Sequence, residues 1–144
     1  MSLLSLASND SAWRGFDYYT QGKVASFANT DEGVYECRIK GSSDAPYHTV
    51  IDITHPRQSH CDCPHAKDRK IICKHMVALL FTAFPKEAEN YLHEVEESER
   101  EEERRIEEHH KELEAYIKRL TKVELQRELY NALLDLEEQK SRHW

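Results

Sequence analysis

The sequence of 144 residues contains no apolar stretch that approaches the roughly 20 residues of a membrane-spanning helix. Its beginning, Met1 to Ala7, also lacks a basic lead and is too short to be the apolar core of a secretory signal peptide. We therefore expect a cytoplasmic protein that does not associate with membranes. Because cytoplasmic thiols are kept reduced, the four cysteines are not expected to form disulfides.

Glycine and proline are absent from residues 86–120, where Glu, Lys and Arg dominate. This absence excludes turns there and predicts one long helix. The charge is also divided, because residues 1–85 hold nine Lys/Arg and nine Asp/Glu, whereas residues 86–144 hold eleven and eighteen and so carry the whole net charge of −7. We predict two parts, a folded module of residues 1–85 and an acidic helical arm of residues 86–144.

Three of the four cysteines lie within residues 61–75, a stretch that ends in a histidine. Their C-x-C…C-x-H pattern has the ligand number and ligand types of a closed structural zinc site, and the ligands are Cys61, Cys63, Cys73 and His75. On a strand, the two side chains of C-x-C point to the same face. A cysteine just before a helix and a histidine in its first turn can also converge. Three thiolates with one imidazole favour zinc over an iron–sulfur cluster, so we predict one structural Zn²⁺ per chain.

The remaining cysteine and two nearby histidines have other expected roles. Cys37 falls on the inward side of a predicted strand and is expected to be a small buried apolar residue. His60 and His65 flank the ligand cysteines and are alternative ligands, although the C-x-H pair already completes four-coordination. A redox role is disfavoured because C-x-C is not the C-x-x-C of thioredoxin-like sites.

The motif C-D-C-P…C-K-H, followed by the apolar run Met76–Phe81, resembles the SWIM-type zinc finger. Upstream, Arg14–Val24 resembles the aromatic, glycine-punctuated lead-in of bacterial members, and Gly41–Ser43 with Tyr47–Val50 resembles their turn and strand. The resemblance covers roughly the first three-fifths of the chain. It implies zinc-dependent binding of DNA or protein, often near chromatin-type ATPases or transposase-like proteins, and no catalysis by the finger.

The pattern of residues 1–85 predicts a small antiparallel sheet. Residues 11–21 predict a short helix with Ser11 as N-cap and Gly22 just past its end. Its aromatic residues suit core packing or, as the alternative, a base-stacking platform. Val34–Lys40 alternate as a half-buried strand, and a second strand shows one inward face. A short third strand then leads to the first ligand cysteine. The inward residues of the second strand are Tyr47, Thr49, Ile51 and Ile53.

In the arm, Pro85 ends the preceding helix or begins the next one. Thr121 and Glu124 form a capping box that starts a last helix. This helix has an apolar stripe, widened by Leu134, and is expected to fold back on Leu113–Leu120 as a helical hairpin. The stripe consists of Leu125, Leu129, Ala132 or Leu133, and Leu136. The predicted fold is therefore α+β, a small antiparallel sheet with a zinc-pinned helix followed by a C-terminal α-helical arm or hairpin.

Catalysis is not expected from this sequence. Four protein ligands leave a zinc ion no open position for water, and neither H-E-x-x-H nor H-x-E with P-C-x-x-C is present. We expect a non-enzymatic recognition module with a protein partner and no small-molecule substrate. The alternative is direct nucleic-acid binding by the basic loop 64–74, through Lys67, Arg69, Lys70 and Lys74.

Overall fold

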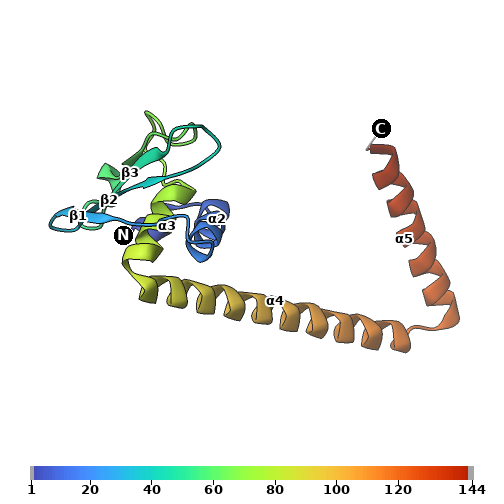
Figure 1. The fold of residues 1–144 in the computed structure, drawn as a ribbon. Coiled ribbons are helices and arrows are strands. Elements are labelled where there is room, and N and C mark those ends of the chain that lie inside the picture. The colour runs from blue at the N-terminus through green and yellow to red at the C-terminus, as the bar shows by residue number, and fades with distance from the viewer. Residues whose placement is uncertain (1, 143–144) are drawn as a thin grey trace. The chain divides into compact units, whose positions relative to one another are not determined.

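The computed structural model describes residues 2–142, which form two compact units, one up to Glu94 and one from Val95 onward (Figure 1). The elements are α1 (Leu3–Leu6), α2 (Asn9–Thr20), β1 (Ala28–Asp31), β2 (Val34–Ile39), β3 (Tyr47–Asp52), the 3₁₀ turn η1 (Pro56–Gln58), β4 (His60–Cys61), α3 (Lys74–Ala83), α4 (Pro85–Arg119) and α5 (Lys122–Arg142). The predicted α+β class is confirmed. No helix within residues 2–142 is both long enough and apolar enough to cross a membrane.

The four strands form one antiparallel sheet in the order β1-β2-β3-β4. Strand β3 alternates buried and half-buried residues, as its sequence predicts. Its register places Thr49 between Cys37 of β2 and Cys61 of β4. Strand β1 was not predicted, because all four of its residues are exposed and it has no apolar alternation to reveal it. It joins the sheet through a tight turn at Gly33, whose φ of 73° favours glycine.

Helix α3 lies between α2 and the sheet (Figure 1). The apolar run that follows the last ligand is fully enclosed, and Phe81 is 0% exposed. Phe16 and Tyr19 of α2 contact the Phe81 ring edge-on, with both centroid distances at 6.0 Å. These half-buried aromatic residues therefore pack against the core, as predicted. Trp13 differs, because 43% of it is exposed.

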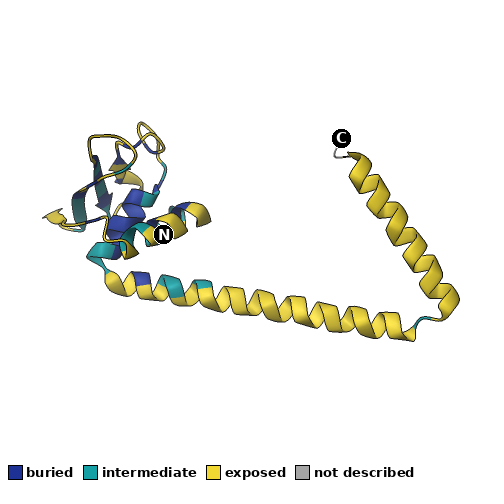
Figure 2. Ribbon diagram, turned by 45° about the vertical axis from the view of Figure 1, so that its right-hand side comes forward, coloured by how far each residue is buried: buried dark blue, intermediate teal, exposed yellow. Residues whose placement is uncertain are grey.

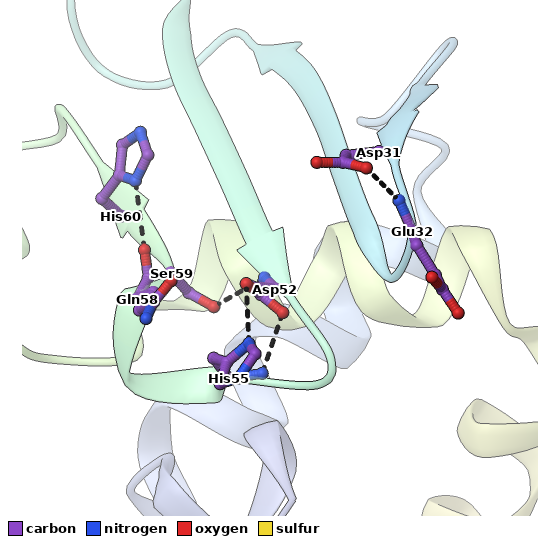
Figure 3. A network of polar contacts seen from close by, with 7 residues as sticks. All are labelled: Asp31, Glu32, Asp52, His55, Gln58, Ser59 and His60. Carbon is purple, nitrogen blue, oxygen red and sulfur yellow. Dashed lines mark hydrogen bonds and ion pairs between the residues drawn. The ribbon is translucent and has the colours of Figure 1, made fainter.

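The loop between β3 and β4 is held by a polar network around Asp52 (Figure 3). The Asp52 carboxylate accepts the backbone N–H of His55 at 2.8 Å and pairs with its ring Nδ1 at 3.5 Å. The backbone N–H of Asp52 donates to the Ser59 hydroxyl at 2.9 Å. These bonds fix the return of the chain from β3 through η1 to the two-residue strand that ends in Cys61.

Helix α2 begins at Asn9, earlier than the predicted start at residue 11. Its N-cap is Ser8, whose hydroxyl accepts the backbone N–H of Ser11 at 3.1 Å. Both serines are suitable cap residues, and the sequence alone did not distinguish them. The predicted end is confirmed, because Gly22 follows the C-cap with a φ of 68°.

The C-terminal helices have the predicted starts. Pro85 is the first residue of α4, and α5 follows a capping box in which the Glu124 N–H donates to the Thr121 hydroxyl at 3.3 Å and the Thr121 N–H to the Glu124 carboxylate at 3.4 Å. The predicted hairpin packing is wrong for this single chain. Figure 2 shows α5 exposed along its described length, and none of its described residues is buried.

The physical reason for this difference is the distribution of leucines around α5. At about 100° per residue, the nine residues from Leu125 to Leu134 place these two side chains on opposite sides of the helix. Leu134 therefore does not widen the stripe of Leu125 but belongs to a second apolar face. One neighbouring helix cannot cover both faces, so a simple hairpin leaves α5 only partly covered.

Candidate metal centre

The four predicted ligands converge in one buried cluster. The potential ligand atoms of Cys61, Cys63, Cys73 and His75 all lie within 4.8 Å of one another. Each of these residues is at most 4% exposed. Within residues 2–142, this is the one group of three or more His, Cys, Asp or Glu side chains with metal-site spacing.

Two of the ligand-to-ligand distances match those expected around a tetrahedral zinc ion. The Nδ1 atom of His75 is 3.8 Å from the Cys61 sulfur and 3.7 Å from the Cys73 sulfur. Zinc bonds of about 2.3 Å to sulfur and about 2.0 Å to nitrogen give ligand-to-ligand separations of about 3.5–3.8 Å in a tetrahedron. The cluster therefore has the ligands and the geometry to hold one zinc ion, with Nδ1 as the coordinating nitrogen of His75.

The two halves of the ligand set come from different local structures. Cys61 ends β4, but Cys63 lies beyond the strand, in a turn where its carbonyl accepts the N–H of Lys67 at 2.8 Å. The prediction that both cysteines sit on a strand is therefore wrong for Cys63. The second half is as predicted, because Cys73 is the N-cap of α3 and His75 lies in its first turn.

Several neighbours orient the ligands. The Thr49 hydroxyl lies 3.2 Å from the Cys61 sulfur, within hydrogen-bonding reach. The His75 ring is flanked by the rings of Tyr18 and Tyr47, with centroid distances of 5.6 and 5.1 Å. Its other nitrogen, Nε2, is buried and makes no hydrogen bond to any described residue. The ring is thus positioned by packing, and Nδ1 is left to face the three sulfurs.

The close approach of the three thiols and their burial shift the pKa of each of them. The Cys73 thiol donates a hydrogen bond to the Cys61 sulfur and, with further donors, lowers the pKa of Cys61 to about 3. The same hydrogen bond, together with burial, raises the pKa of Cys73. Burial is the main cause of the raised pKa of Cys63. Zinc must therefore displace thiol protons to bind, so acid opposes zinc binding.

The other cysteine and the two alternative histidine ligands lie outside the cluster. Cys37 is buried on β2, and desolvation is the main cause that raises its pKa to about 12. It therefore has the inert, apolar role that its strand position predicted. The ring of His60 is exposed, with Nδ1 3.3 Å from the Gln58 carbonyl (Figure 3). His65 is exposed on the wall of a cavity of about 200 Å³ beside the cluster.

The four residues predicted to contact nucleic acid differ in their exposure to solvent. Lys67, Arg69 and Lys70 are exposed in the loop before α3. Lys74 is half-buried in the first turn of α3, and its ammonium lies 4.8 Å from the centre of the Tyr18 ring. A cation above an aromatic face is already partly satisfied. The loop thus offers three accessible cations rather than four.

Thr49 and Tyr18 were not predicted to support the metal centre. Thr49 gave a usable signal, because it is a polar residue on an otherwise apolar strand face that points toward the ligands. Tyr18 gave none, because its contact with His75 depends on how α2 packs against α3.

Comparison with known proteins agrees with this geometry. Residues 47–84 match the family model of the SWIM zinc finger, and they contain all four ligands. The upstream part of the stated resemblance, Arg14–Val24 and Gly41–Ser43, lies outside the matched residues. No curated protein matches the chain. No solved structure matches it either.

Proposed function

We propose that this chain, whose residues 47–84 form a SWIM zinc finger, is a non-enzymatic recognition module that binds other proteins within a DNA-handling assembly. The observation that carries the proposal is the closed ligand set, in which four buried side chains occupy all positions of a tetrahedral ion. Such an ion has no free position for a substrate or an activated water. Its role is to hold β4 and α3 together.

The first unit offers a protein partner a groove of about 690 Å³. Apolar side chains of α1, α3 and the start of α4 line it, among them Leu3, Leu80 and Phe84. The charged residues on its wall are Glu87 and Glu94, and no lysine or arginine is among the lining residues. These two residues are seven positions apart, so their carboxylates lie about 10 Å apart on one side of α4. The groove therefore suits a peptide or helix with apolar anchors and two basic residues.

Reversing the groove charges should remove the partner. In the variant Glu87→Lys with Glu94→Lys, a basic segment would meet two like charges instead of two opposite ones, which costs several kcal/mol across an interface. We expect zinc-loaded protein with this change to lose the binding partners that the unchanged protein captures from a lysate of its native host. Mass spectrometry of the captured proteins is the measurement.

The matched control reverses the same number of charges elsewhere on α4. Glu89 and Glu96 are also seven residues apart and exposed, but they lie on another side of the helix and do not line the groove. Glu89→Lys with Glu96→Lys should keep the partners. A groove variant that captures the same proteins as this control would contradict the assignment of the groove.

Direct nucleic-acid binding is the second candidate, favoured by one observation. Lys67, Arg69 and Lys70 are exposed and form no ion pair with any residue of the described chain. Three neutralised phosphates would give a salt slope of about −3, so binding would be weak at physiological salt. The acidic arm also opposes approach to a duplex.

Replacing these three residues with alanine should abolish binding of a short duplex at low salt and leave the zinc content unchanged. Fluorescence anisotropy with labelled DNA measures the first and elemental analysis the second. The control removes the same charge from α5 by changing Lys122, Arg127 and Lys140 to alanine, and it should bind DNA at least as well as the unchanged chain. Tight binding that survives the loop substitutions would overturn the ranking of protein over DNA.

A further inference from the structure

Most of the large apolar side chains that are exposed in the described chain lie along the arm. Eleven of the thirteen exposed large hydrophobic residues of the described chain lie between residues 106 and 136. Burying a side chain of this kind removes on the order of 60–120 Å² of apolar surface from water. Together the eleven residues offer on the order of 700 Å² or more of apolar surface, divided among separate faces.

These eleven residues form three separate apolar faces. Helix α4 carries one, the distal stripe, and α5 carries two, a wide face and a narrow face, whose centres lie about 125° apart around the helix. Figure 2 shows both helices exposed throughout this region. The distal stripe consists of Ile106, Leu113, Tyr116 and Ile117; the wide face of Leu125, Leu129, Leu133 and Leu136; and the narrow face of Val123, Tyr130 and Leu134.

An odd number of faces cannot be paired within one chain. Packing α4 against either side of α5 covers two faces and leaves the third in water. Two copies supply six faces, which can all be paired. A helix whose apolar residues extend around about half of its circumference is characteristic of a bundle, where more than one neighbour packs against it.

The charges of the arm also permit contact between copies where the apolar faces are densest. Residues 96–112 hold four Lys/Arg and nine Asp/Glu, so two copies repel each other along this section. Residues 113–136 hold four Lys/Arg and four Asp/Glu, so self-association there meets no net repulsion. Ten of the eleven exposed residues lie in this neutral section. If the second copy covers all ten, the contact area per copy is on the order of 600–1,200 Å², a range that includes the roughly 800 Å² per partner of a stable interface.

We propose that two copies of this chain associate through residues 113–136 and that the second copy completes the cover of both faces of α5. The arm is thereby a dimerisation element, separate from the groove and the zinc centre of the first unit. This inference does not depend on the protein partner proposed above.

The test is the mass of the full-length, zinc-loaded chain in solution, measured by light scattering after size exclusion over a range of concentrations. We expect a dimer. On the wide face, Leu129→Gln with Leu136→Gln should weaken it by at least about tenfold in Kd, and so should Tyr130→Gln with Leu134→Gln on the narrow face. Leucine and glutamine have similar helix propensities, so the wide-face change acts on packing rather than on helix formation.

The matched control is Glu128→Gln with Asp135→Asn, two exposed residues that lie on neither face and whose replacement removes two negative charges. It should remain a dimer. Zinc content, which reports on the first unit, should be the same in all variants. A monomer at every concentration would overturn the proposal, as would a dimer that either apolar double variant leaves intact.

Discussion

Replacing Cys63 and Cys73 together with serine should release the zinc ion and unfold the first unit. Zinc binding contributes about 10–16 kcal/mol to small zinc domains, which equals or exceeds the roughly 5–15 kcal/mol of net stability of an ordinary domain. This unit has little else to hold β4 and α3 together, because β4 has only two residues. Elemental analysis measures the zinc, and the dispersion of amide signals in an NMR spectrum measures the fold.

Cys37 supplies the control for this prediction. It is also buried, but it lies on β2 outside the ligand cluster. Cys37→Ala removes one buried sulfur and should cost about 1–2 kcal/mol, with one zinc ion per chain retained. Full zinc content in the Cys63→Ser, Cys73→Ser protein would show that these two residues are not ligands.

Substituting Gly15 with alanine should destabilise the first unit, although alanine favours a helix by about 1 kcal/mol over glycine. A Cβ at this position would lie 2.4 Å from the Cβ of Val77 and 2.9 Å from the Lys74 carbonyl oxygen. Val77 is 0% exposed and cannot move aside, so α2 and α3 must separate. Overpacking of this kind costs about 1–3 kcal/mol or more, which lowers Tm by about 5–20 °C in a unit of this size. Thermal unfolding followed by circular dichroism measures the change.

A second substitution tests the mechanism of this effect. Val77→Ala alone should also lower Tm, because it leaves a cavity. Combined with Gly15→Ala, it removes the closest clash, so the double variant should lose less stability than the two single losses added together. A Gly15→Ala protein with an unchanged or higher Tm would mean that the two helices do not pack as closely as described.

The metal centre could be predicted because its information is local. Cys61 and His75 are fourteen positions apart, and the apolar run after His75 predicts the helix α3, which begins at Lys74. Spacing, ligand type and helix start therefore agree within one short stretch. The same holds for α5, whose capping box of Thr121 and Glu124 lies next to its first turn.

Features that depend on distant contacts were missed. Strand β1 has no apolar residue larger than alanine, and pairing with β2 rather than its own sequence makes it a strand. The closeness of Gly15 to Val77 follows from how two helices cross, which spacing does not reveal. The hairpin was predicted because a leucine stripe needs a partner. In the structure no described residue of α5 is buried, so α4 does not provide that partner surface.

The short span between the ligands also determines the order of events when the protein folds. The zinc ion closes a ring of fifteen residues from Cys61 to His75, and chain segments of this length meet within about a microsecond. Docking α2 on α3 requires far more distant segments to meet, such as Gly15 and Val77, and such a step is slower. The metal-bound ring can therefore form first and present the start of α3 as a surface on which the other elements assemble. Zinc binding is then expected to precede the docking of α2 on α3.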